Sequence, residues 1–63
     1  MQWTDTYLIA IALIEKYPDV EPLGLRFTDL FQYVCDLEGF VGAKNHCNEK
    51  VLEAIQMAWL AEV

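Results

Sequence analysis

The chain has 63 residues, and its ten acidic and four basic side chains give a formal net charge of −6. This length is enough for one small domain over 1–63, and an apolar content of 56% excludes a disordered chain. The acidic balance excludes a nucleic-acid binder, because phosphate recognition needs clustered basic residues and the four here are scattered.

Membrane and secreted proteins are also poor matches to this sequence. The longest unbroken apolar run, residues 8–14, is far shorter than the roughly 18 residues of a membrane span. The opening residues MQWTD lack the basic and apolar regions of a secretory signal. Two cysteines do not make a disulfide framework. We therefore expect a cytoplasmic protein with no membrane contact and with both thiols reduced.

Residues 4–18, TDTYLIAIALIEKYP, predict the first helix. Thr4 is a preferred cap residue, and Asp5 then lies in the first turn, where a negative charge favours the helix dipole. Pro18 forces Tyr17 out of the helical conformation and ends the helix there. The segment PDVEPLG follows with two prolines and a glycine in seven residues, so it predicts a turn-rich connection.

Residues 27–39, FTDLFQYVCDLEG, predict the second helix by the same signals. Thr28 is its expected cap, and Asp29 takes the first helical position. An apolar stripe at helical spacing predicts one buried face. The members of this stripe are Leu30, Val34 and Leu37.

Residues 48–63, NEKVLEAIQMAWLAEV, predict the third helix, with Asn48 as its cap and Glu49 in its first turn. Glu53 and Gln56 are expected on the solvent side, opposite an apolar stripe. That stripe is formed by Leu52, Ile55 and Trp59. No pair of long alternating strands is present, so the predicted class is mainly α with three helices.

Several short blocks in this order resemble the IscX family, small acidic proteins of bacterial iron–sulfur cluster assembly. The resemblance runs through almost the whole chain without an obvious insertion. The blocks are Trp3-Thr4-Asp5, Tyr17-Pro18-Asp19, RFTDL at 26–30, CDLE at 35–38, NEK at 48–50, LEAI at 52–55 and Trp59-Leu60. The resemblance implies a winged-helix-like, mainly helical domain that is not an enzyme. It also implies a protein that binds the cysteine desulfurase IscS, binds iron weakly through surface carboxylates and modulates cluster formation.

The resemblance also indicates which acidic residues carry these roles. The expected iron-binding residues are Asp5, Asp29, Asp36, Glu38, Glu49 and Glu53. The expected partner-binding residues are Asp19, Glu21, Asp29, Asp36 and Glu38. An acidic domain that meets a basic partner surface gains association rate from electrostatic steering, and it loses that gain as salt rises.

Each of these acids also has a structural interpretation. Asp5 and Asp29 are helix-start acids, each worth about 0.3–1 kcal/mol through the helix dipole. Asp29 and Asp36 are seven residues apart, roughly 10 Å along a helix, so one ion cannot bridge them. Glu49 and Glu53, four apart, lie side by side and either hold one hydrated cation or form a solvated helix face.

The chain departs from the family in two places. The loop after CDLE is usually a run of aspartates, whereas here residues 39–44 read GFVGAK. The first helix carries Leu8 and Ile11 where acids are usual, and Ile14 follows on the same helix. We therefore expect an exposed apolar patch, which typically marks an interface. The alternative function is a structural module that self-associates through Leu8, Ile11 and Ile14 and has lost iron binding.

The stretch Cys35–Glu49 holds both cysteines and the single histidine. Cys47 and His46 precede a helix start, where the pKa of a thiol is often lowered. A stable zinc site, however, needs four ligands at recognisable spacings, and two cysteines twelve apart beside one histidine do not supply them. We therefore interpret this stretch as a helix end, a loop and a helix cap, with Cys35 as a small buried apolar residue.

Overall fold

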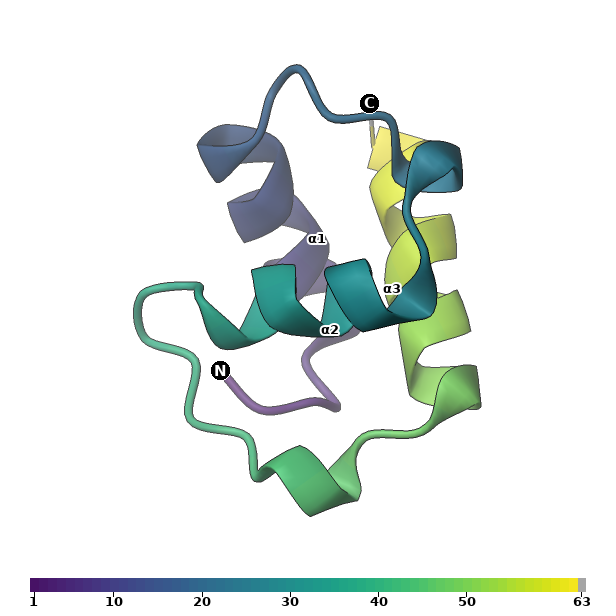
Figure 1. Cartoon of the computed structure of the whole chain (residues 1–63). Helices are drawn as coiled ribbons and strands as arrows, with labels where there is room; N and C mark the ends of the chain where they lie inside the picture. Colours follow the sequence, from purple (N-terminus) through teal and green to yellow (C-terminus); the bar gives the residue numbers. More distant parts are fainter. Residues whose placement is uncertain (63) are drawn as a thin grey trace.

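The computed structural model describes residues 1–62 and contains three α-helices and two short 3₁₀ turns (Figure 1). The helices are α1 (Thr6–Lys16), α2 (Phe27–Cys35) and α3 (Glu49–Glu62), and the turns are η1 (Pro22–Gly24) and η2 (Lys44–His46). The predicted mainly α class with three helices is confirmed. No strand occurs among these 62 residues, so the winged-helix likeness stays a prediction. The predicted end of the third helix at Val63 lies outside the described residues.

α1 packs mainly against α3, and α2 crosses in front of this pair (Figure 1). The predicted apolar stripes of α2 and α3 all lie in the core between the helices, together with one face of α1. The core is formed by Trp3, Ile9, Ala10, Leu13, Leu30, Val34, Leu37, Leu52, Ile55 and Trp59. Within residues 1–62 no helix has both the length and the apolar character needed to cross a membrane.

The first two helices begin at positions other than those predicted. α1 starts at Thr6, so Thr4 is not its cap, and the Asp5 carboxylate instead accepts a hydrogen bond of 2.8 Å from the Gln2 backbone N–H. α2 starts one residue before Thr28, at Phe27. Asp5 takes the N-cap position of α1 and not the predicted place in its first turn, whereas Asp29 does lie in the first turn of α2. Threonine is the cap of neither helix.

The predicted end of α1 and the predicted start of α3 are confirmed, whereas α2 ends at Cys35 and does not include the predicted residues 36–39. α1 ends at Lys16, one residue before the Tyr17–Pro18 pair. At α3 the Asn48 side-chain oxygen accepts a hydrogen bond of 3.0 Å from the Val51 backbone N–H, which is the geometry of an N-cap. The Gln56 side chain differs from its predicted solvent position. It is half-buried and donates a hydrogen bond of 2.9 Å to the Pro22 carbonyl oxygen, which ties η1 to α3.

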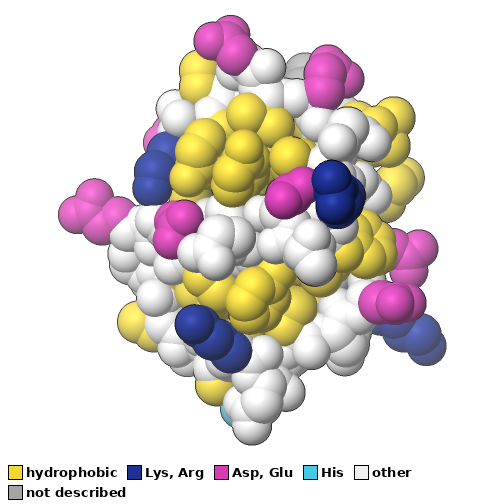
Figure 2. All heavy atoms as spheres, in the orientation of Figure 1, with side chains coloured by type: hydrophobic (Ala, Val, Ile, Leu, Met, Phe, Trp, Pro, Cys, Tyr) yellow, Lys and Arg dark blue, Asp and Glu magenta, His cyan; other side chains and the backbone are white. Residues whose placement is uncertain are grey.

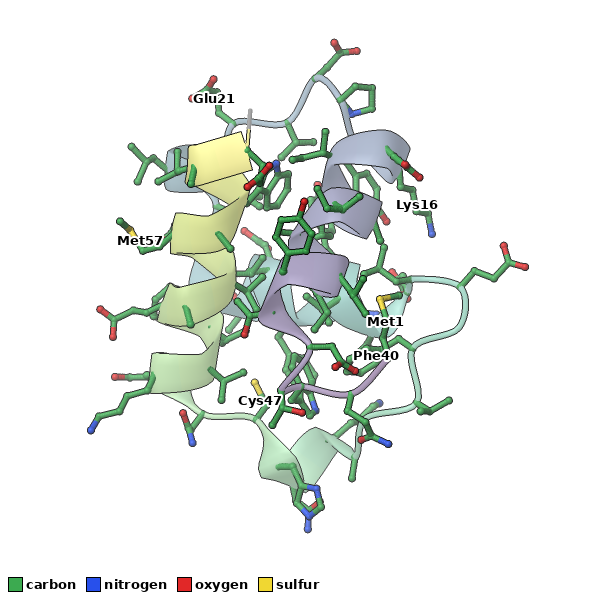
Figure 3. The ribbon with its side chains drawn as sticks, turned by 180° about the vertical axis from the view of Figure 1, so that it is seen from behind. Met1, Lys16, Glu21, Phe40, Cys47 and Met57 are labelled. Carbon is green, nitrogen blue, oxygen red and sulfur yellow. The ribbon has the colours of Figure 1, made fainter. Side chains whose placement is uncertain are left out.

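The segment between α2 and α3 is held against the first residues of the chain. The Val41 backbone N–H donates to the Met1 carbonyl oxygen at 2.8 Å, and Met1 lies beside Phe40 in Figure 3. The Trp3 indole N–H donates to the Ala43 carbonyl oxygen at 2.7 Å. The loop at residues 39–44 is therefore anchored on buried Trp3.

Candidate functional site

The acidic residues predicted to bind iron or a partner are almost all on the surface. Asp5 is half-buried, and the others are exposed to solvent. The exposed residues are Asp19, Glu21, Asp29, Asp36, Glu38, Glu49 and Glu53. Surface position fits long-range attraction of a basic partner, because exposed charges act through the solvent field rather than through close pairs.

These carboxylates are distributed over the molecule. Asp29 and Asp36 lie near opposite ends of α2, and Glu49 and Glu53 lie one turn apart at the start of α3. In Figure 2 acidic side chains are spread over one face, some along its outline and some beside the central apolar patch, and they do not gather at one point. Among residues 1–62 no group of three or more His, Cys, Asp or Glu side chains is close enough to hold a metal ion. Neither the predicted acids nor the Cys35–Glu49 stretch forms a chelating cluster.

Two of the acids on α2 have internal hydrogen bonds. Asp29 accepts one from the Arg26 backbone N–H at 3.4 Å, and Asp36 accepts one of 3.0 Å from the Gln32 side chain. The bond to Asp29 is long, so it stabilises the start of α2 only weakly. These carboxylates therefore have structural roles and still face solvent.

Sequence reasoning missed a groove between α2 and the start of α3, which we call the α2–α3 groove. It has a volume of about 330 Å³. Its walls are Phe27, Thr28, Phe31, Lys44, Cys47, Asn48, Glu49 and Leu52. Figure 2 shows apolar patches on both sides of α2, and a basic side chain borders the lower patch. The four-residue spacing of Phe27 and Phe31 was the available signal, but nothing local showed which segment would face them.

The floor of the groove is formed by packed aromatic rings. The Phe31 ring stacks on the Trp3 indole, with centroids 5.5 Å apart and ring planes inclined by 18°. Phe40 meets the other side of Trp3 edge-on, with centroids 4.7 Å apart. Trp3 is only 4% exposed, so the Phe31 ring packs on a buried side chain. Phe31 itself is half-buried and partly accessible to solvent. One wall of the groove, with Lys44 and Cys47, comes from the segment between α2 and α3.

A second aromatic cluster lies at the other end of α2. Tyr17 and Tyr33 stack with centroids 4.4 Å apart and ring planes inclined by 12°. The Lys16 ammonium lies 5.5 Å from the centre of the Tyr17 ring and donates a hydrogen bond of 2.8 Å to the Asp36 carbonyl oxygen. This lysine therefore satisfies a carbonyl at the end of α2, which is a structural role.

Cys35 and Cys47 are both half-buried free thiols. Burial is the main cause that raises the pKa of each thiol above its ordinary value, and for Cys47 the nearby Cys35 adds to the effect. At Cys35 the positive charge of Lys44 partly opposes this rise. The expectation of a lowered pKa at Cys47 from the following helix is therefore wrong, because burial of the thiol raises its pKa. Figure 3 shows the Cys47 side chain turned towards the body of the molecule.

The predicted apolar patch on the first helix is present in part. Leu8 is 55% exposed and Tyr7 is 59% exposed, whereas Ile11 is half-buried. Ile14 packs partly against the core and so contributes less to this surface. The patch is therefore centred on the first turns of α1.

Two comparisons relate this chain to known proteins. A family model described as iron–sulphur cluster assembly matches residues 1–63. The uncharacterized protein PA3808 of Pseudomonas aeruginosa is 45% identical over 62 residues, which cover 98% of this chain and 94% of that protein.

Proposed function

Because this chain belongs to the iron–sulphur cluster assembly family, we propose that it is a non-enzymatic accessory protein that binds the cysteine desulfurase IscS. By this binding it modulates cluster formation in the cytoplasm. Its partner meets the exposed acids of α2 and of the two connections, with Asp29, Asp36 and Glu38 at the centre and Asp19 and Glu21 at the edge.

The observation that carries this proposal is the exposure of these acids on a chain with a net charge of −6. A basic surface on the partner would be attracted over about a Debye length, roughly 8 Å at physiological salt. Such attraction raises the association rate and orients the encounter. The family match supplies the pathway, and the charge distribution supplies a physical reason for docking.

The same proposal includes weak iron binding, with iron as cargo. A carboxylate set with no cluster of three ligands among residues 1–62 favours a loosely held, hydrated ion. Glu49 and Glu53 are the best-placed pair, because residues four apart on a helix are neighbours. Titration of Fe²⁺ into Glu49→Gln/Glu53→Gln should show weaker binding than into Asp29→Asn/Asp36→Asn. An equal loss of Fe²⁺ affinity in both double variants would mean that iron binding depends only on the net charge of the protein.

Calorimetric titration of the protein into purified cysteine desulfurase, at low and at high salt, tests the partner. Binding that weakens as salt rises is expected. Asp29→Lys and Glu38→Lys should each weaken binding several-fold at low salt. Glu62→Lys is the matched control, because this exposed residue at the end of α3 undergoes the same change of charge outside the proposed contact. No binding at low salt would refute the docking proposal.

A second candidate function is self-association through the apolar surface of α1. The exposure of Tyr7 and Leu8 favours it, because a contiguous apolar patch on a surface often marks an interface. The sequence predicts Leu8, Ile11 and Ile14 as the contact residues. Sedimentation of the wild type and of Leu8→Glu/Ile11→Glu shows whether the protein self-associates through this surface of α1. A dimer that the double substitution converts to a monomer supports this function, and a monomer in both proteins removes it.

A further inference from the structure

Two of the acids proposed to meet the partner lie on one short turn directly after α2, residues 36–39, which we call the Asp36–Gly39 turn. Asp36 and Glu38 are exposed, whereas Leu37 between them is 6% exposed and belongs to the core. Gly39 closes the turn with a φ of +83°, in the left-handed region that suits glycine. The buried Leu37 thus fixes the turn to the core and leaves a carboxylate in solvent on either side of it.

Lys16, the last residue of α1, joins this turn to a second helix. Its ammonium group donates a hydrogen bond of 2.8 Å to the Asp36 carbonyl oxygen, 20 residues away in the chain. The side chains of Lys16, Leu37 and Glu38 line the same hollow between α1 and the turn. Figure 3 shows Lys16 on the same side of the molecule as Phe40, which directly follows the turn. The turn is therefore held at Leu37 by the core and at Asp36 by Lys16.

A basic residue at this place works against long-range attraction of a basic partner. Loss of the Lys16 ammonium would change the formal net charge from −6 to −7, and a more negative surface attracts a basic one more strongly. If docking depended on charge alone, a neutral residue at position 16 would therefore favour it. The hydrogen bond to the Asp36 carbonyl has a different effect, because it orders the turn before any partner arrives. Such preorganisation lowers the cost of binding.

We infer that Lys16 is a positioning residue for docking: by holding the Asp36–Gly39 turn against α1, it presents the Asp36 and Glu38 carboxylates to the partner in one arrangement. This inference rests on the proposed function, since the partner is the cysteine desulfurase and these two acids belong to its proposed contact. Lys16 acts through the position of the turn, and its own charge opposes the attraction.

Lys16→Met separates the two effects, because it removes the ammonium group and keeps an unbranched side chain. Calorimetric titration into the desulfurase at low salt should show binding about threefold or more weaker than that of the parent protein. Lys50→Met is the matched control, since it makes the same change of charge at an exposed position in the first turn of α3. It should bind as tightly as the parent or more tightly. Lys16→Arg keeps the charge and the donor groups, and it should stay within about twofold of the parent.

Gly39→Ala disturbs the same turn without changing any charge. An added Cβ would meet no atom within 4 Å, so its only cost is the positive φ, which an alanine rarely adopts. This variant should also bind the desulfurase about threefold or more weakly. Gly24→Ala is its control, because the φ of Gly24 lies outside the left-handed region. Urea unfolding of each variant establishes a temperature at which it is folded, so that a lower affinity does not report unfolding.

Both losses are required. If the parent binds but Lys16→Met binds as tightly as Lys50→Met, or Gly39→Ala binds as tightly as Gly24→Ala, the positioning role is overturned while the proposed function stands. If the parent itself does not bind at low salt, the proposed function fails, and this inference fails with it.

Discussion

The Trp3 indole stacks on the Phe31 ring at a centroid distance of 5.5 Å, and this contact joins the start of the chain to the middle of α2. The same indole donates its N–H to the Ala43 carbonyl oxygen at 2.7 Å. One side chain thus holds the groove floor and the α2–α3 loop together. Aromatic pairs of this kind add about 0.5–1.5 kcal/mol beyond the area they bury.

Trp3→Phe tests the hydrogen bond within this arrangement. The substitution keeps an aromatic ring but removes the donor to Ala43, so the free energy of unfolding should fall by about 1–3 kcal/mol from the unpaired carbonyl and the lost volume. Urea unfolding followed by circular dichroism measures the change. Trp3→Leu, which removes the stacking as well, should cost more than Trp3→Phe. Equal losses would mean that stacking on Phe31 adds nothing.

Gly42→Ala should destabilise the protein although it adds a single methyl group. A Cβ at this position would lie 2.6 Å from the Phe40 ring and 2.8 Å from the Trp3 ring. Because both rings are packed against each other, we expect a loss of about 1–3 kcal/mol, the usual cost of overpacking. Gly24→Ala is the matched control, since its nearest neighbour is a side-chain carbon of Glu21 at 3.8 Å. Thermal or urea unfolding compares the two variants.

Asn48→Ala should shorten or fray the first turn of α3. The substitution leaves the Val51 backbone N–H without the side-chain acceptor that now lies 3.0 Å away. The expected loss is about 1 kcal/mol. Asn48→Asp should retain most of the stability, because a carboxylate accepts the same bond and favours the helix dipole. Asn45→Ala, at an exposed position in η2, is the control and should be neutral within about 0.5 kcal/mol. An equally large loss of stability in Asn45→Ala would contradict the role of Asn48 as the N-cap of α3.

The two thiols should titrate at higher pH in the folded protein than in the unfolded chain. Burial disfavours the thiolate and raises the pKa of Cys35 and of Cys47. The rate of alkylation by iodoacetamide, measured from neutral to alkaline pH, should therefore reach its midpoint at higher pH in water than in concentrated urea. Cys35→Ser and Cys47→Ser separate the two sites. Identical pH profiles in the two solvents would disprove the shift.

The same raised thiol pKa values set the direction of a stability change with pH. Between the unfolded and the folded pKa, the folded state binds more protons than the unfolded state, so stability decreases as pH rises. The contribution of each thiol is complete below its unfolded pKa and is lost as pH passes its folded pKa. Urea unfolding of the wild type should show this alkaline loss, and Cys35→Ser/Cys47→Ser should show less of it.

Much of the fold was determined by local sequence signals. Asn48 before an apolar stripe at helical spacing predicted α3, because capping and periodicity act within one or two turns of the chain. Pro18 predicted the end of α1, because proline restricts the backbone of the residue directly before it. The charge of −6 and the ordered family blocks indicated the family, and the family model confirmed it.

Tertiary structure decided the features that depend on distant partners. Gln56 was expected in solvent but donates to Pro22, 34 residues away in the chain. In the sequence the loop at 39–44 differs only by its loss of acids. In the structure its Ala43 carbonyl oxygen accepts a hydrogen bond from Trp3, 40 residues away, and its last residue, Lys44, lines the α2–α3 groove. Helix periodicity specifies which face of an element is apolar, but only the packing of α2 against the start of α3 specifies what that face meets.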